Sequence, residues 1–308
     1  MIENLIILAA SLFFVVKGAT WSTKYSVKIA ESCRLSKYII GFIVIAIISI
    51  LPETFIAINS AVQGTPGLGL GTLFGSNVAD LTLVFAIIIA FSGRGIKIQS
   101  TILKNNIVYP FLLLVPLILG FNGHYSRWEG LALIIIGIIF YYLAFKNSVN
   151  SPSKNPPDNR LKNIFFLIIS LAVLLISSYF TVISAIELAK GLYINPIFIG
   201  IFIIGLGTTM PELIFSLKSV KRHDDSLAIG DILGTVLADA TIVVGILALA
   251  SPFYFPQKII YATGSFMVLA SFLLFYFMRS GKMLSKKESR LLFLFWLFYV
   301  MIEFFINR

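Results

Sequence analysis

Residues 41–53 read Gly-Phe-Ile-Val-Ile-Ala-Ile-Ile-Ser-Ile-Leu-Pro-Glu, and residues 71–82 read Gly-Thr-Leu-Phe-Gly-Ser-Asn-Val-Ala-Asp-Leu-Thr. The same pattern returns 159 positions later without a gap, as Gly-Ile-Phe-Ile-Ile-Gly-Leu-Gly-Thr-Thr-Met-Pro-Glu at 200–212 and Gly-Asp-Ile-Leu-Gly-Thr-Val-Leu-Ala-Asp-Ala-Thr at 230–241. The matched positions place four acids inside apolar segments: Glu53, Asp80, Glu212 and Asp239. Acidic side chains are costly inside a membrane and usually mark an ion pathway. The duplication therefore predicts a cation site built from both copies.

The composition is that of a membrane protein. The 308 residues are 58% hydrophobic and 12% charged, whereas a soluble domain carries about 25% charged residues. The N-terminus leads into a long apolar run with no basic region before it, so we expect a retained helix rather than a signal peptide. Cys33 is the single cysteine of the sequence, which excludes a disulfide framework. We attribute the net charge of +10 to cytoplasmic loops and expect no nucleic-acid partner.

Ten apolar runs are long enough, at about 20 residues each, to cross a bilayer. They fall near 3–20, 36–62, 67–92, 101–121, 127–146, 162–189, 195–217, 225–251, 257–279 and 290–307. The second and third runs of each half contain Pro or Gly, which predicts kinked or broken helices. The expected fold is therefore an all-α polytopic membrane protein with ten transmembrane helices.

The distribution of Lys and Arg sets the expected orientation. Loops after the odd-numbered runs hold 20 of the 24 basic residues, and the opposite loops hold 4. Because cytoplasmic loops are enriched in Lys and Arg, this asymmetry predicts a multi-pass protein of the cell (plasma or inner) membrane with both termini outside.

The polar, proline-rich segment 147–162 divides the chain into two five-helix halves, 1–146 and 163–308. Because each half has an odd number of helices, the second half enters the membrane from the opposite side, and the repeats are inverted. Inverted repeats with broken helices place the substrate site near the midplane, at the interface between the repeats. We expect 147–162 to be a cytoplasmic linker and the chain to function as a monomer in the lipid bilayer.

Each Pro-Glu pair supplies oxygen ligands. Pro52 and Pro211 lack an N–H, so each leaves a main-chain carbonyl one turn earlier without its helical donor. Hydroxyl groups lie beside these carbonyls, from Ser49 in the first copy and from Thr208 and Thr209 in the second. Carboxylate, carbonyl and hydroxyl oxygens together suit a hard cation such as Ca2+. The motifs contain no His or Cys, which argues against a soft-metal site.

The second motif places hydroxyls and acids on one helix face. Ser76 and Asp80 are four residues apart, as are Thr235 and Asp239, so each pair faces one side of its helix. Glycines at four-residue spacing run beside them and would allow two helices to approach closely.

With these duplicated motifs, the chain resembles the sodium/calcium exchangers of the calcium:cation antiporter superfamily. The resemblance covers essentially the whole chain. It implies a secondary active antiporter, not an enzyme, that exchanges Ca2+ for Na+ by alternating access and carries no cofactor. It also implies that helices 1 and 6 slide across a rigid core.

The resemblance implies a role for each candidate ligand. The implied Ca2+ ligands are Glu53, Glu212 and main-chain oxygens at Ser49 and Thr208. The implied Na+ ligands are Thr209, Ser76, Thr235 and carbonyls near Ala46 and Gly205. The acids implied to line the middle position are Asp80 and Asp239.

Three positions depart from the family pattern. Ile50 replaces a hydroxyl residue, which removes a ligand from one of the two flanking sodium positions. Asp80 stands where Asn is common, and Asp231 replaces the usual Asn without a role that the sequence can assign. Two adjacent carboxylates rarely both ionise unless a cation lies between them. A Ca2+/H+ antiporter, or an exchanger of another divalent cation for H+, is therefore the alternative.

Two other functional classes also place acids inside membranes. An intramembrane aspartyl protease would use Asp80 and Asp239 as its dyad, but Asp231 follows Ala-Ile-Gly, which lacks the first Gly of the Gly-x-Gly-Asp motif. A channel rarely needs two matched Pro-Glu breaks. Flux in proteoliposomes separates the three classes, because only an exchanger requires a counter-ion on the opposite side.

Overall fold

The computed structural model describes residues 1–32, 46–98, 108–146, 160–281 and 283–307, and nearly all of this chain is helical. The helical elements before residue 147 are α1 (Ile2–Ser32), α3 (Ala46–Ser49), α4 (Leu51–Val62), α5 (Pro66–Ala79), the π-helical η2 (Asp80–Val84), α6 (Phe85–Ser92), α8 (Val108–Leu112), α9 (Leu114–Leu119), the 3-10 turn η3 (Gly120–Asn122) and α10 (Arg127–Lys146).

The helical elements after residue 159 are α11 (Arg160–Leu192), α12 (Pro196–Ile199), the π-helical η4 (Gly200–Ile204), α13 (Gly205–Thr208), α14 (Met210–Lys221), α15 (Asp225–Ala238), the π-helical η5 (Asp239–Val243), α16 (Val244–Ala250), the π-helical η6 (Ile259–Gly264), α17 (Ser265–Gly281) and α18 (Lys286–Asn307).

The repeated sequence forms repeated structure. Adding 159 to the bounds of α3, α4, α5 and η2 gives the bounds of α13, α14, α15 and η5 residue for residue. The N-terminal caps of α10 and α18 repeat too. Ser126 and Glu129 form a reciprocal capping box, and Ser285 and Glu288 form the same one, with 2.7 Å hydrogen bonds to the glutamate in both.

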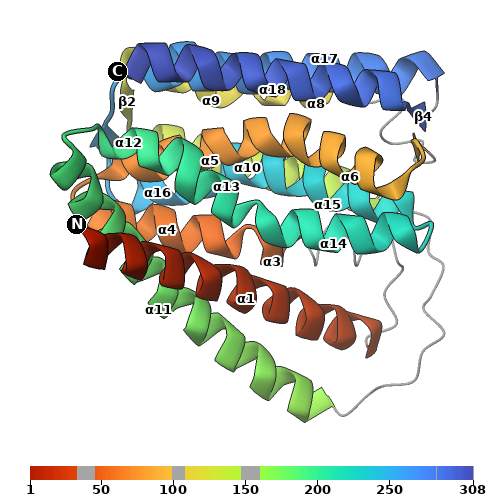
Figure 1. Ribbon diagram of the computed structural model, residues 1–308, viewed down its shortest axis with the longest axis horizontal. Coiled ribbons are helices and arrows are strands. Elements are labelled where there is room, and N and C mark those ends of the chain that lie inside the picture. The colour runs from red at the N-terminus through yellow and green to blue at the C-terminus, as the bar shows by residue number, and fades with distance from the viewer. Residues whose placement is uncertain (33–45, 99–107, 147–159, 282, 308) are drawn as a thin grey trace.

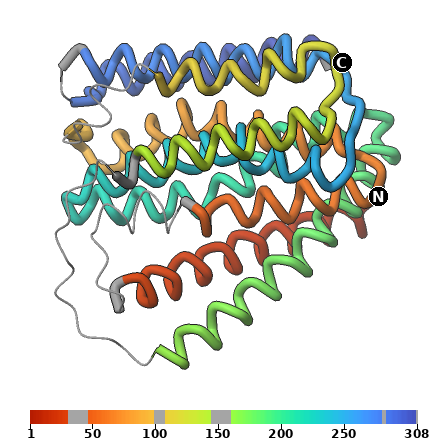
Figure 2. The backbone as a smooth tube through the Cα atoms, turned by 180° about the vertical axis from the view of Figure 1, so that it is seen from behind, coloured from red at the N-terminus to blue at the C-terminus, as the bar shows by residue number. Residues whose placement is uncertain are grey.

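The helices lie in layers (Figures 1 and 2). α1 and α11 pack along each other as an outer layer, and α17 and α18 form the layer on the opposite side. Between them lie the elements that carry the duplicated motifs. α5 and α15 are buried along almost their whole length, so their side chains contact other helices rather than lipid.

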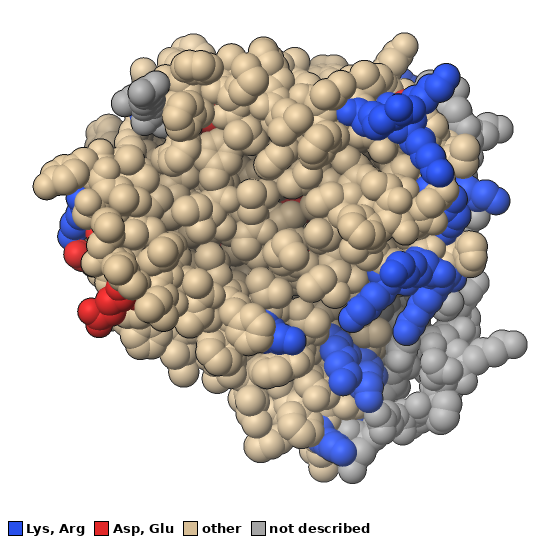
Figure 3. Space-filling model, viewed as in Figure 1, with Lys and Arg blue, Asp and Glu red and all other residues tan. Residues whose placement is uncertain are grey.

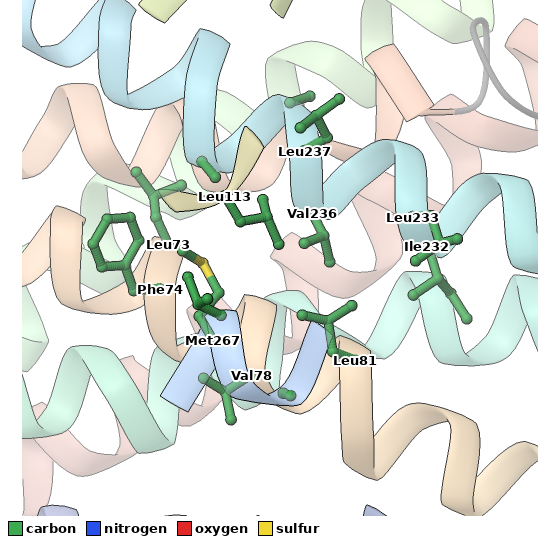
Figure 4. Packing of buried hydrophobic residues seen from close by; sticks show 14 of the residues in the cluster. Leu73, Phe74, Val78, Leu81, Leu113, Ile232, Leu233, Val236, Leu237 and Met267 are labelled. Atoms are coloured by element: carbon green, nitrogen blue, oxygen red, sulfur yellow. The ribbon is translucent and has the colours of Figure 1, made fainter. Parts of the chain in front are cut away.

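The core lies where α5 and α15 approach each other (Figure 4). Leu73, Phe74 and Val78 of α5 pack with Leu233 and Val236 of α15 in one buried cluster, which also takes in side chains from α17. The two motif-bearing helices are therefore packed into the same core.

Two short ribbons add strands to the expected all-α fold. β1 (Ile96–Lys97) pairs antiparallel with β4 (Met283–Leu284), and β2 (His124–Tyr125) pairs with β3 (Phe253–Tyr254). Each ribbon joins a loop before residue 147 to a loop after residue 159. β2 and β4 are equivalent by the 159-residue offset, yet they lie at opposite ends of the molecule (Figure 1).

Within the described residues, seven helices are long and apolar enough to cross a membrane, and two shorter apolar helices cover Ile47–Val62 and Val108–Asn122. α10 coincides with the expected span 127–146. Parts of the expected spans 36–62 and 101–121 lie outside the described residues.

Two expected boundaries differ from the structure. α1 continues to Ser32, beyond the expected end at residue 20, because its polar last turns pack on α11, where the ring of Tyr25 stacks on Phe166 at 5.1 Å. α11 begins at Arg160, so the last residues assigned to the linker are helical, and 147–159 lies outside the described residues.

The two ends of the molecule differ in charge. Both termini lie at one end in Figure 1. On the face shown in Figure 3, Lys and Arg gather mainly along the other end. This separation matches the asymmetry of basic residues along the sequence.

Candidate cation site

Two broken helices carry the glutamates. α3 ends at Ser49 and α4 begins at Leu51, and the equivalent break separates α13 from α14 at Thr209. The prolines lie in the first turn of α4 and of α14, where a missing N–H costs nothing. Glu53 and Glu212 therefore lie in the first turn of a new helix, at the end that favours negative charge. The breaks expected at the Pro-Glu pairs are confirmed.

All four repeated acids are enclosed. Glu53 and Glu212 are each 1% exposed, Asp80 is 2% exposed and Asp239 is 0% exposed. A charge buried this deeply must be neutralised by a partner, a bound cation or a proton. None of the four points into lipid.

The acids also have free oxygen atoms. Among the described residues, both carboxylate oxygens of Glu212 and of Asp239 have no hydrogen-bond partner, and one oxygen each of Glu53 and Asp80 has none. The Thr235 hydroxyl is likewise without a partner within that part of the chain. Buried polar atoms are usually hydrogen-bonded, so a group of free oxygens calls for an explanation. Cation coordination supplies one.

The two copies converge on this group. Glu53 and Asp80 lie near enough to Glu212 for their charges to repel it, and both also act on Asp239. The side chain of Thr208, from the second copy, lies within hydrogen-bonding reach of the Glu53 carboxylate. The acids of the two motif copies thus lie in the same buried region of the protein.

Asn77 shows how the copies face each other. Its Nδ2 donates a 3.2 Å hydrogen bond to the carbonyl oxygen of Val236, the residue equivalent to Asn77 in the second copy. A residue that contacts its own equivalent lies where the two copies meet. Asp80 follows Asn77 by three residues, and Asp239 follows Val236 by three residues. Each aspartate therefore lies about one helical turn beyond this contact, in its own copy.

The expected hydroxyl ligands are buried, but most donate to the protein. Ser76 donates to the carbonyl of Leu73 at 3.0 Å. Thr208 and Thr209 donate to the carbonyl of Gly205 at 3.1 and 2.8 Å. A hydroxyl that donates one bond still has lone pairs for a cation. Ala46 is the first residue of α3, and the surroundings of its side chain lie outside the described residues.

Glycines bring the helices of the site together. A Cβ atom added to Gly75 would lie 2.8 Å from the carbonyl oxygen of Ile201, and one added to Gly200 would lie 2.7 Å from that of Leu68. A Cβ atom on Gly205 would lie 3.2 Å from the main-chain nitrogen of Ser76. Helix α5 and the η4–α13 segment therefore cross in backbone contact, as small residues at this spacing permit.

Three residues of this region had no role assigned from the sequence: Tyr109, Tyr141 and Asp231. The phenol groups of Tyr109 and Tyr141 donate to the carbonyls of Leu233 and Gly234 at 2.7 and 2.6 Å, which fixes the position of α15. Asp231, on α15, is 0% exposed and had no assigned role. The hydroxyls of the two tyrosines, each within an apolar run, were the signal in the sequence.

Within the described part of the chain, no three His, Cys, Asp or Glu side chains form a ready-made metal cage. A cation here would therefore combine carboxylates with main-chain and hydroxyl oxygens, a mixed set that Ca2+ accepts.

Comparison with known proteins identifies the family. The family model described as "Sodium/calcium exchanger protein" matches residues 3–146 and 162–305, which include both copies of the motif. The chain belongs to the sodium/calcium exchanger family. It is thus a membrane antiporter of a transporter family rather than of an enzyme family.

Relatives of this exchanger come from several prokaryotes. It is 28% identical over 275 residues to the uncharacterized membrane protein MJ0091 of Methanocaldococcus jannaschii, covering 88% of each chain. It is 23% identical to the sodium/calcium exchanger MaX1 of Methanosarcina acetivorans, covering 98% of this chain and 99% of MaX1. It is 25% identical to the inner membrane protein YrbG of Escherichia coli, covering 80% of this chain and 79% of YrbG.

A solved structure shows the same fold. The sodium-calcium exchanger NCX_Mj, soaked with Na+ and Sr2+, superposes with a TM-score of 0.72 at 23% identity and covers 98% of both chains. The overall arrangement of helices is therefore that of a known polytopic exchanger.

Proposed function

We propose that this exchanger is a secondary active antiporter that moves Ca2+ against Na+ by alternating access. The observation that carries the proposal is the buried group of four acids, drawn from both copies, with six carboxylate oxygens that have no hydrogen-bond partner among the described residues. The relative MaX1 is named a sodium/calcium exchanger, and the fold is that of an exchanger soaked with Na+, Ca2+ or Sr2+.

The proposed ligands are the residues that the sequence singles out. Glu53 and Glu212 hold Ca2+ together with main-chain oxygens at Ser49 and Thr208. Asp80 and Asp239 line the space between the glutamates. The proposed Na+ ligands are Thr209, Ser76, Thr235 and the carbonyls of Ala46 and Gly205. No resident cofactor is part of the proposal, since Ca2+ and Na+ are the cargo.

Competition for shared oxygens produces the exchange. The acids attract either one Ca2+ ion or several monovalent ions, and repulsion between cations disfavours holding both sets. Each ion therefore displaces the other. A site that opens to the two sides in turn then exchanges them without a continuous pore.

We also propose the arrangement in the membrane. Ten spans form two inverted halves, 1–146 and 163–308, joined by a cytoplasmic linker at 147–162, with both termini outside and a single chain as the working unit. The position of both termini at the end opposite the basic one supports this orientation. The opposite placement of the equivalent strands β2 and β4 supports the inversion.

The moving part in this proposal is the pair α1 and α11. Ser11 and Thr181 are hydrogen-bonded across their interface at 3.0 Å, and Ser22 and Ser170 at 3.1 Å. Gly18 packs its backbone against Leu174. These contacts bind the two helices to each other, so the pair slides as one body over the buried core.

The test is uptake of ⁴⁵Ca²⁺ into proteoliposomes under a Na+ gradient or a pH gradient, each applied alone. An outward Na+ gradient should drive uptake in the wild type. Glu53→Gln and Glu212→Gln should each abolish it. Glu187→Gln is the matched control, because Glu187 is 48% exposed and pairs with Lys190 at the surface. Wild-type uptake in either site variant would remove that residue from the site.

Coupling to H+ is the second candidate. It is favoured by Ile50, which is buried beside the first Pro-Glu pair and offers no oxygen where Thr209 offers a hydroxyl. Uptake driven by a pH gradient alone, with no response to Na+, would select it. In that case Asp80→Asn should shift the pH profile of transport more than the affinity for Ca2+.

A further inference from the structure

The two copies differ chemically at the edge of the site. By the 159-residue offset, Asp231 of α15 corresponds to Thr72 of α5, and Thr209 corresponds to Ile50. Thr72 donates a 2.9 Å hydrogen bond to the carbonyl of Leu68 in its own helix. The first copy thus has no side-chain oxygen at Ile50, while the second has a carboxylate at Asp231.

Asp231 lies against the first Pro-Glu break. It is 0% exposed, and its Oδ1 accepts a 3.1 Å hydrogen bond from the Ser49 hydroxyl, which belongs to the last residue of α3. Ile50 is the next residue along the chain. The carboxylate that the second copy supplies therefore lies one residue along the chain from the position where the first copy lacks a side-chain oxygen.

The other oxygen of Asp231 is free. Within the described residues Oδ2 has no hydrogen-bond partner, although it is fully buried. The charge of Asp231 acts on Asp80 and on Glu212, so the carboxylate lies in the same buried region as the repeated acids. A buried anionic oxygen with no donor, facing other acids, is costly unless a cation neutralises it.

We propose that Asp231 and Ser49 form a monovalent-cation subsite on the α3 side of the transport site, and that it takes Na+. The subsite rests on the proposed exchange of Ca2+ and Na+. Asp231 supplies an anionic oxygen in place of the hydroxyl missing at Ile50.

The chemistry of the two side chains fits one monovalent ion. A serine hydroxyl has one donor and two acceptor lone pairs, so Ser49 can donate to Oδ1 and still coordinate a cation. One carboxylate neutralises one positive charge. Ca2+ takes about 6–8 oxygens, commonly with several carboxylates, and is better served by the central glutamates.

The test is equilibrium binding of ⁴⁵Ca²⁺ to the purified full chain, with Na+ as competitor. Asp231→Asn keeps the shape of the side chain and removes its charge. We expect the inhibition constant for Na+ to rise at least about tenfold, because a charge-assisted contact is lost. The dissociation constant for Ca2+ should change less than this. Ser49→Ala should weaken Na+ in the same direction.

If Asp231 acted only as a distant charge, its loss would change the Ca2+ and Na+ constants in a different ratio. Coulomb energy scales with the charge of the ion, so a purely long-range effect on Ca2+ would be twice that on Na+ in free energy. The fold-change for Ca2+ would then be about the square of the fold-change for Na+. A loss for Ca2+ as large as or larger than the loss for Na+ overturns the subsite, and so does an unchanged Na+ constant.

The control is the equivalent position in the other copy. Thr72→Val removes a hydroxyl that is bonded within its own helix and should leave both constants within about twofold of the wild type. If wild-type protein bound no Ca2+ that Na+ displaces, the proposed Na+ exchange would fail and the subsite with it. If the wild type showed that competition and Asp231→Asn retained it unchanged, the subsite alone would fail.

Discussion

Replacing Gly75 by alanine tests whether the close crossing of α5 and η4 sets the geometry of the cation site. The new Cβ atom would lie 2.8 Å from the carbonyl oxygen of Ile201 and 2.9 Å from its Cα, whereas ordinary contact begins at 3.4 Å. Both neighbouring atoms belong to the backbone and cannot rotate away. The two segments must therefore separate by about 0.5 Å, at an overpacking cost of about 1–3 kcal/mol.

That separation acts directly on the proposed ligands. Ser76 follows Gly75 on α5, while Gly205 and Thr208 follow Ile201 on the other segment. Metal–ligand distances hold to within about 0.2 Å, so a shift of this size spoils coordination. We expect Gly75→Ala to weaken Ca2+ binding at least about tenfold, or 1.4 kcal/mol.

The assay is ⁴⁵Ca²⁺ binding to purified protein, with a monodisperse gel-filtration peak as the criterion of folding. Gly191→Ala is the matched control, since a Cβ atom there would have only the Cγ of Met1 nearby, at 4.0 Å. The control should bind Ca2+ like the wild type. A folded Gly75→Ala protein with wild-type affinity would refute the link between the helix crossing and the site.

Four further substitutions probe the scaffold by thermal unfolding in detergent. Ser126→Ala and Ser285→Ala each remove an equivalent helix cap and should each cost about 1 kcal/mol, and a large difference between them would contradict the structural repeat. Arg94→Leu removes the guanidinium bound at 2.6 and 2.7 Å to the buried Asp225 and should cost about 2 kcal/mol; an unchanged midpoint would show that water replaces it. Ser22→Ala removes one hydroxyl bond between α1 and α11 and should cost about 0.6 kcal/mol, so a loss several times larger would point to a wider rearrangement.

The duplicated motifs made the centre of the fold predictable. Pro52 and Pro211 each interrupt a helix through their own chemistry, whatever surrounds them. The two interruptions, at Ile50 and at Thr209, are both present. The burial of Glu53 and Glu212 was also predictable, because a carboxylate in an apolar helix is costly where it faces lipid. Local chemistry and repetition were sufficient for these features.

Features that depend on contacts between distant segments could not be predicted. Two of the π-helical turns begin at Asp80 and Asp239, and nothing in their local sequence requires a wider turn than the α-helix. The extension of α1 depends on α11 lying beside it. The bond from Asn77 to Val236 shows where the copies meet, but it is visible only once α5 and α15 are packed together.

Chemical differences between the two copies affect the relative energies of the two open states of such a transporter. If two inverted copies were chemically identical, the states open to either side would be mirror versions of each other with equal energy. Every difference between equivalent positions biases that balance. Arg94 and Asp225 form an ion pair between the copies at the basic end, whereas their equivalents, Phe253 and Pro66, can form none. The ion pair stabilises one end of the molecule and has no equivalent at Phe253 and Pro66, so in the proposed alternating-access cycle it contributes to the balance between the two open states.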